Sequence, residues 1–190
     1  MQTYTRVFCA VAIALCAAPI AALAADPRPC ELFSPKEIAS VLGGTPKPGQ
    51  LSEVMDKDVA AMAWDCEWSV GGRKFIARVI RFPSAADATR ELPSMVEMLT
   101  SEVAMATMAL GMFESSPVSS PDVDLKLSEV PGPGEQNFWG SSYKNDTIWI
   151  SRKGQTVLGV VVIDMDKPMR PESLREPIRD LVASGLRKLP

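Results

Sequence analysis

Residues 157–163 read Val-Leu-Gly-Val-Val-Val-Ile, an unbroken apolar run that follows a Lys153-Gly154 turn. Short apolar runs rich in β-branched residues are typical of strands that are buried inside a sheet. We therefore predict a strand over residues 155–163 at the centre of the sheet. Three more strands are expected before it, over residues 124–130, 137–143 and 147–152.

The first half of the chain predicts one helix and one hairpin. Ser34 and Glu37 form a capping box with a proline between them at the first helical position, so we expect a helix over residues 35–42. Residues 62–70 and 74–82 are strand-like and surround a Gly-Gly turn, which predicts a β-hairpin. A polar, proline-bearing stretch, in which no helix or strand is predicted, separates the helix from the hairpin and reaches about residue 59.

Two further helices are predicted. Ser84 is a suitable N-cap, and the helical pattern after it continues past Pro93 to about residue 113, so we expect a kink or a break at the proline. Residues 115–121 contain two prolines and four serines and predict a surface loop. The last helix starts near Pro171 and has one apolar face.

This order of elements predicts an α+β fold. An antiparallel sheet with helices packed on one face accommodates a helix, a hairpin, a second helix, a run of strands and a last helix. Both halves of the chain end in a helix after strands, which suggests a duplicated strand-strand-helix unit.

The N-terminus has the organisation of a secretory signal peptide. Residues 1–6 form a short, positively charged segment, and residues 7–20 are almost entirely apolar. Ala22-Leu23-Ala24 fits an A-x-A cleavage site. We predict a cleaved signal over residues 1–24 and a single secreted domain over residues 25–190, in the periplasm or outside the cell. The apolar run is too short to span a bilayer comfortably and no second one follows, so we expect no transmembrane segment in the mature chain.

Charge and composition exclude several function classes. Removing residues 1–24 takes away one of the 20 basic residues and none of the 23 acidic ones, which leaves a net charge of −4. Nucleic acid and anionic membranes are therefore poor partners. The chain contains no histidine, which excludes Ser-His-Asp and Cys-His hydrolases and nearly all catalytic zinc sites.

Cys30 and Cys66 are the two cysteines that survive cleavage. In an oxidising compartment an isolated pair most simply forms one disulfide, and we predict this bond. A redox-active pair is disfavoured, because such pairs are normally Cys-x-x-Cys. Lipid attachment through Cys9 or Cys16 is also disfavoured, because neither follows the small residues that a lipoprotein signal needs.

Several short motifs are spread over most of the mature chain. They are Pro29-Cys30-Glu31-Leu32, Ser34-Pro35-Lys36-Glu37-Ile38, Cys66-Glu67-Trp68, Val130-Pro131-Gly132-Pro133-Gly134-Glu135, Phe138-Trp139 and Lys153-Gly154. Together they resemble a family of small secreted bacterial proteins of unknown function, many of them actinobacterial lipoproteins. The resemblance implies a secreted α+β domain with a Cys30–Cys66 bridge and without catalytic residues to carry over. The chain differs from that pattern because neither Cys9 nor Cys16 fits a lipid-attachment site.

The second predicted helix carries a methionine stripe beside an aliphatic one. Met98, Met105, Met108 and Met112 fall in one arc at 100° per residue. Flexible methionines that fill gaps in the core are the simplest interpretation. A surface for an apolar ligand or a protein partner is the second, and a copper(I) site that includes Met105 and Met108 is the third, because thioethers select that ion.

The aromatic residues and small motifs give weaker signals. Trp64 and Trp68 share one strand face by their spacing, and Trp139, near the glycine turn, is a candidate for an aromatic binding surface. The Pro-Gly-Pro-Gly segment before it looks superficially like a phosphate loop, but it lacks the helix and lysine that such a loop needs. A tight turn between strands is the simpler interpretation.

These observations predict a non-catalytic secreted or periplasmic protein whose function is binding, with no cofactor. Its ligand is an unidentified protein or apolar molecule. An inhibitor or immunity protein that blocks a secreted or periplasmic enzyme is the first alternative, and the methionine-rich copper(I)-binding protein is the second.

Overall fold

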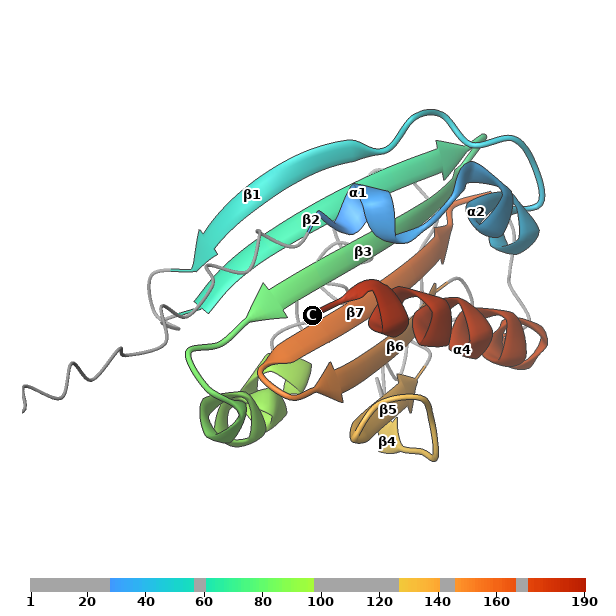
Figure 1. Cartoon of the computed structure of the whole chain (residues 1–190). Helices are drawn as coiled ribbons and strands as arrows, with labels where there is room; N and C mark the ends of the chain where they lie inside the picture. Colours follow the sequence, from blue (N-terminus) through green and yellow to red (C-terminus); the bar gives the residue numbers. More distant parts are fainter. Residues whose placement is uncertain (1–27, 57–60, 98–126, 141–145, 167–170) are drawn as a thin grey trace, which may run out of the picture.

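A computed structural model of the chain describes residues 28–56, 61–97, 127–140, 146–166 and 171–190. Its centre is a seven-stranded antiparallel sheet in the order β1-β2-β3-β7-β6-β5-β4 (Figure 1). The apolar run predicted as the central strand is β7, and it lies between β3 and β6. The strands are β1 (Gln50–Asp56), β2 (Ala61–Val70), β3 (Arg73–Arg81), β4 (Ser128–Glu129), β5 (Gln136–Gly140), β6 (Asp146–Lys153) and β7 (Thr156–Asp164).

Three of the helices have complete bounds: α1 (Pro29–Leu32), α2 (Pro35–Leu42) and α4 (Pro171–Lys188). A further helix covers residues 85–97. The predicted capping box begins α2, since the Ser34 side chain accepts from the Glu37 N–H and the Glu37 side chain accepts from the Ser34 N–H. Gly43 ends this helix with a φ of 76°, a conformation that favours glycine.

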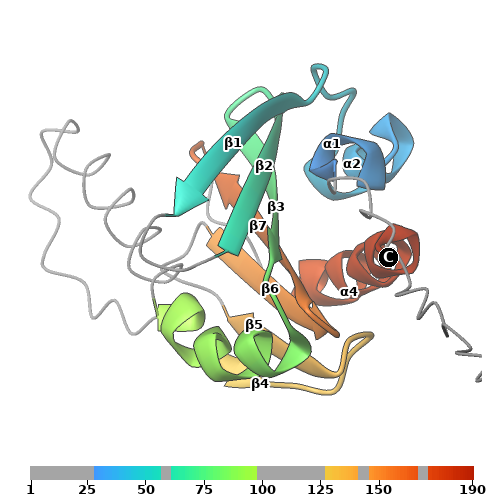
Figure 2. The ribbon, with the colours of Figure 1, turned by 60° about the vertical axis from the view of Figure 1, so that its left-hand side comes forward.

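The two faces of the sheet are buried by different helices. Side chains alternate along each strand, so Phe75 and Val79 of β3 point to one face while Ile76 and Ile80 point to the other. The first face packs with α1, α2 and α4 in one core, and the second packs with the helix over residues 85–97 in another. Figure 2 shows α1, α2 and α4 on one side of the sheet and the green helix on the opposite side.

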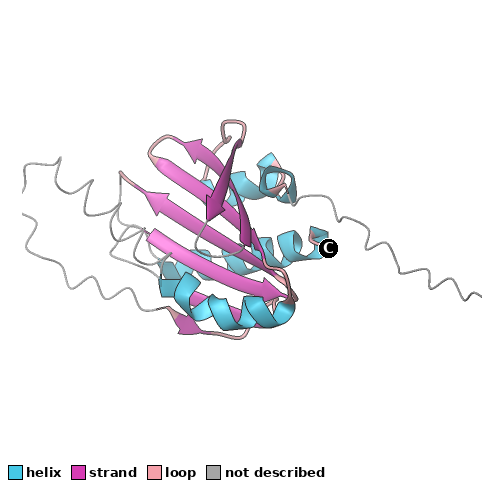
Figure 3. Ribbon diagram, turned by 90° about the vertical axis from the view of Figure 1, so that its left-hand side faces the viewer, coloured by secondary structure: helices cyan, strands magenta, loops and turns pink. Residues whose placement is uncertain are grey.

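The α+β class, the antiparallel sheet and the disulfide are confirmed, but the prediction that all helices lie on one face needs a correction. Ala88, Leu92 and Met95 of the helix over residues 85–97 are buried among side chains such as Ile150 and Val161, which point away from α4. Figure 3 shows this helix in front of the strands, with α4 behind them. A central strand that is apolar on both faces needs cover on both.

The strands repeat in the two halves, although the helix positions do not. β1, β2 and β3 form one antiparallel meander, and β5, β6 and β7 form another. The two meanders meet where β3 pairs with β7. The helices that follow them pack on opposite faces, so any duplicated unit comprises the three strands without the helix.

Two local predictions differ from the structure. The polar, proline-bearing stretch, for which no strand was predicted, contains β1, which pairs with β2 over seven residues from Gln50↔Glu67 to Asp56↔Ala61. A pairing partner overrides a weak strand propensity. The helix over residues 85–97 runs through Pro93 without a break, and the remainder of that predicted helix lies outside the described residues.

The Cys30–Cys66 disulfide is present, with a Cα–Cα distance of 5.2 Å, and joins α1 to β2. Cys66 is fully buried. The backbone at Gly49 lies directly over the bond, because a Cβ built there would be 2.6 Å from the Cys66 Sγ. The bond is therefore part of the packed core that holds the short helix α1 on the sheet.

Glu37 connects the start of α2 to the end of α4. Partial burial raises the pKa of this carboxyl. Hydrogen bonds from Ser34 and Ser184 and the nearby charge of Lys188 lower it, and they outweigh the effect of burial. The pKa of Glu37 therefore lies below its ordinary value of 4.5. A lowered pKa stabilises the fold above pH 4.5, and this contribution is lost as the pH falls through the folded-state pKa.

We expect Glu37→Gln to weaken the acid dependence of stability. The free energy of unfolding of the wild type should fall more steeply than that of the variant as the pH is lowered from about 5 to about 3. Urea unfolding at a series of pH values measures both slopes. Parallel curves would show that the hydrogen bonds of Glu37 do not favour its ionised form.

Candidate functional site

The residues of the methionine stripe, Met98, Met105, Met108 and Met112, lie outside the described residues. The partner surface and the copper(I) site predicted from them therefore stay predictions. Among the described residues, no group of three or more histidine, cysteine, aspartate or glutamate side chains is placed to hold a metal ion. None of the described helices is long and apolar enough to cross a membrane.

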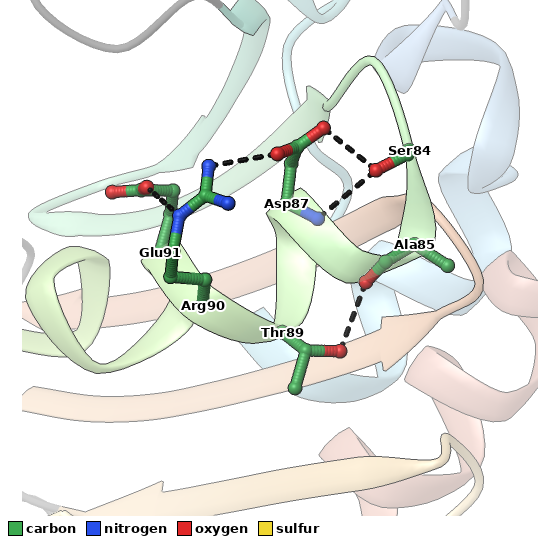
Figure 4. Close-up of polar contacts among 6 residues, drawn as sticks. All are labelled: Ser84, Ala85, Asp87, Thr89, Arg90 and Glu91. Atoms are coloured by element: carbon green, nitrogen blue, oxygen red, sulfur yellow. Dashed lines mark hydrogen bonds and ion pairs between the residues drawn. The ribbon is translucent and has the colours of Figure 1, made fainter.

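The helix over residues 85–97 begins with a network of hydrogen bonds and ion pairs among its first residues (Figure 4). The Ser84 hydroxyl accepts from the Asp87 N–H at 3.1 Å and donates to its carboxylate at 2.6 Å. Arg90 binds Asp87 at 2.7 Å and Glu91 at 2.8 Å. The bond from Ser84, followed by that from Arg90, lowers the pKa of Asp87. Ser84 and Asp87 therefore cap the helix, and Arg90 is shared between the two carboxylates.

Trp139 does not form an exposed aromatic surface. Its side chain is only 6% exposed. The side chain points to the face covered by α4, where its ring centroid lies 5.3 Å from that of Trp149 on the neighbouring strand β6. Trp64 and Trp68 are likewise buried on one face, as their spacing predicts, while Asp65 and Glu67 bind Arg78 and Lys74 on the other.

Close to Trp139, buried side chains hold a turn between β4 and β5. We call residues 131–135 the Pro-Gly turn. Asn137, on β5, is 4% exposed and holds the backbone of Gly134 in both directions. The Gly134 N–H donates to the Asn137 Oδ1 at 2.9 Å, and the Asn137 Nδ2 donates to the Gly134 carbonyl at 2.9 Å. The single amide side chain of Asn137 therefore fixes both backbone polar groups of Gly134.

Asn137 is itself oriented by a buried chain of hydrogen bonds. The Ser151 hydroxyl donates to the Asn137 Oδ1 at 2.7 Å and accepts from the Trp149 Nε1 at 2.9 Å. Ser151 and Trp149 are almost completely buried. Buried polar groups of this kind are stable only when each has a partner, so the chain fixes the amide in one orientation.

Glu135 connects the Pro-Gly turn to the hairpin turn between β6 and β7. Its carboxylate accepts from the Gly154 N–H at 3.0 Å and forms an ion pair with Arg152, whose side chain is 10% exposed. The Glu135 N–H donates to the Arg152 carbonyl at 2.7 Å. The Pro-Gly-Pro-Gly-Glu and Lys153-Gly154 motifs, which are separate in the sequence, are thus in direct contact.

The tip of the turn, residues 131–133, has no polar side chain, and Glu135 after it is also exposed. Pro131, Gly132 and Pro133 are exposed, whereas Val130 packs against the core and its N–H donates to the Asn137 carbonyl at 2.9 Å. Because the Gly134 and Glu135 N–H groups already donate within the protein, they are not available to an anion. A phosphate-binding role is therefore disfavoured by geometry as well as by sequence.

Gly134 is required by close packing. A Cβ at this position would lie 2.6 Å from the Arg152 carbonyl oxygen, which is backbone and cannot rotate away. We expect Gly134→Ala to lower the free energy of unfolding by about 2 kcal/mol, as overpacked sites do. Urea unfolding measures the loss. Gly71→Ala, where a Cβ meets open space at a φ of 57°, is the control and should cost about 1 kcal/mol. Equal losses would contradict the packing argument.

Sequence reasoning identified this segment as a tight turn but did not identify the residues that hold it. Asn137 and Ser151 form a cross-strand pair, and only the register of β5 and β6 reveals it. The one available signal was a buried-strand position occupied by asparagine, next to a glycine-rich turn that needs hydrogen-bond partners.

Comparisons with known proteins place the chain in no family. No family model matches it, and no curated protein matches it. Among solved structures, the extracellular domain of PknH from Mycobacterium tuberculosis is similar to 80% of this chain, over 93% of its own length, with 11% sequence identity and a TM-score of 0.43. Neither fold nor function is transferred from a likeness of that size.

Proposed function

We propose that the chain is a non-catalytic binding protein of the periplasm or the extracellular space, and that the Pro-Gly turn is its recognition element. The observation that carries the proposal is the way an exposed turn is held by buried polar side chains. Asn137, Ser151 and Arg152 all lie at or near complete burial and direct their hydrogen bonds to the turn or to residues that hold it.

Fixing a loop in advance favours binding. Association costs free energy for every segment that must be ordered, and a loop that is already rigid avoids this cost. Binding residues are often found on loops that a rigid scaffold positions. A turn that served only to connect β4 and β5 would not need three buried polar side chains.

The disulfide supports the extracytoplasmic part of the proposal. Cys30 and Cys66 are bonded inside the core, and such bonds form and persist in oxidising compartments.

The same turn also favours the first alternative, an inhibitor or immunity protein. Inhibitors of secreted enzymes bind with backbones that scarcely move on association, and the Pro-Gly turn is held in that way. An inhibitor should form a one-to-one complex with a single enzyme and abolish its turnover. A binding protein of another kind should leave enzyme activities in the same extract unchanged.

Native mass spectrometry of the protein, purified gently from its own envelope fraction, tests the proposal. We expect a stoichiometric complex with a second polypeptide or a small molecule, which dissociates when the protein is denatured. Wild-type protein that is consistently bare, even after incubation with fresh envelope extract, would contradict a binding function.

A further inference from the structure

We infer that the Pro-Gly turn inserts its two exposed prolines into an apolar, aromatic-lined pocket of a protein partner. This inference rests on the proposed binding function and specifies the partner's chemistry. It follows from the apolar surface that the tip of the turn, residues 131–133, exposes to a partner, and from the absence of polar side chains at that tip.

The tip presents apolar surface that is already ordered. Pro131, Gly132 and Pro133 are exposed, and proline and glycine lose no side-chain rotamer entropy when they are buried. The backbone on either side is fixed, since Val130 and Gly134 both hydrogen-bond to Asn137. Burying this tip therefore costs little conformational entropy, and the buried pyrrolidine surface contributes directly to affinity.

The tip, residues 131–133, offers a partner no polar side chain. Neither proline has a backbone N–H, and the N–H groups of Gly134 and Glu135 donate within the protein. The Glu135 carboxylate is bound to Arg152 and to the Gly154 N–H. A charged pocket would lose its hydration without gaining an ion pair with any side chain of the tip, and such desolvation is unfavourable.

Aromatic side chains suit this surface best among apolar ones. Proline-rich segments dock in aromatic-lined grooves by virtue of their fixed backbone, and tryptophan and tyrosine are enriched where protein interfaces concentrate their binding energy. The complementary site is therefore a pocket with aromatic walls and few charges.

Site-specific photo-cross-linking in the host identifies what contacts the turn. The photoreactive amino acid p-benzoylphenylalanine replaces Glu129, which is exposed, lies two residues before Pro131 and leaves both prolines intact. The control carries it at Ser52, which is exposed on β1 at the other edge of the sheet. We expect one protein to cross-link from position 129 and not from position 52. Equal labelling from both positions would overturn the inference.

The cross-linked protein, once purified, is then titrated against defined variants. The double variant Pro131→Ala/Pro133→Ala should bind at least about 30-fold more weakly than wild type, the loss typical of a binding hot spot. Pro83→Ala removes a different exposed proline and should bind like wild type. Circular dichroism of each variant verifies the fold. Binding by the double variant within threefold of wild type would overturn the inference.

The salt dependence gives an independent readout. An aromatic, apolar pocket predicts an affinity that changes less than about threefold between low and high sodium chloride, because only charged contacts are screened. A steep loss of affinity with salt would show a charged pocket and overturn the inference. If native mass spectrometry shows a bound polypeptide that does not cross-link from position 129, this inference alone is refuted. If the protein is always bare, the proposed function is refuted as well.

Discussion

Replacing both Cys30 and Cys66 by alanine should lower the free energy of unfolding by about 4 kcal/mol. The bond closes a loop with a sequence separation of 36 residues, and the chain-entropy model gives a loss of this size when such a loop is opened. Urea unfolding of the oxidised wild type and the double variant measures it. In a domain of this size the melting temperature should fall by about 10 °C.

The wild type unfolded under reducing conditions is the matched comparison. It should be destabilised to nearly the same extent as the double variant, because both lack the covalent link and differ only at two sulfur atoms. We expect α1 to be the first element to detach, since the bond joins this four-residue helix to β2. A stability loss below about 1 kcal/mol would contradict a structural role for the disulfide.

Asn137→Ala should lower the free energy of unfolding by about 3 kcal/mol and release the Pro-Gly turn. The substitution removes three hydrogen bonds: two to the Gly134 backbone and one from the Ser151 hydroxyl. A buried donor or acceptor left without a partner costs about 1–3 kcal/mol, and water reaches the half-exposed Gly134 more readily than Ser151. Chemical denaturation measures the loss.

Gln136→Ala is the matched control. Gln136 is the neighbouring amide residue and accepts one hydrogen bond, from the Arg152 Nε, at a half-buried position. Its removal should cost less than about 1 kcal/mol and leave the turn in place. If the two variants were equally stable, the Asn137 network would not be what holds the turn.

Much of the fold could be predicted because local signals agreed with the final packing. The capping box at Ser34, the Gly71-Gly72 turn and the apolar run of β7 each specify an element through nearby residues alone. The disulfide followed from counting the cysteines that remain after the signal. These features need no knowledge of what lies across the sheet.

Two of the errors in the fold involved distant partners. β1 has little strand propensity of its own and exists because β2 pairs with it along its whole length. The side of the sheet on which the helix over residues 85–97 packs depends on the direction in which the chain leaves β3, which composition does not encode. Hydrophobic periodicity shows that a helix buries a face but not which sheet face receives it.

The candidate site was predictable only as a turn. Its glycines and prolines are local signals, whereas its function as a rigid element depends on Asn137 on β5 together with Ser151 and Arg152 on β6. Trp139 was predicted as a candidate for an aromatic binding surface because it is close to the turn, but its position in β5 places its side chain in the core. The polar residue two positions earlier is the one that contacts the turn.

Amide hydrogen exchange of the free protein, followed by NMR, tests the central claim most directly: that the Pro-Gly turn is rigid before any partner binds. We predict that the Gly134 and Glu135 amides exchange slowly, through the same global opening as the core strands, while the amide of the exposed Gly71 exchanges rapidly. Exchange at Gly134 and Glu135 as fast as at Gly71 would show a turn that opens locally, and would contradict the claim that it is preorganised for recognition.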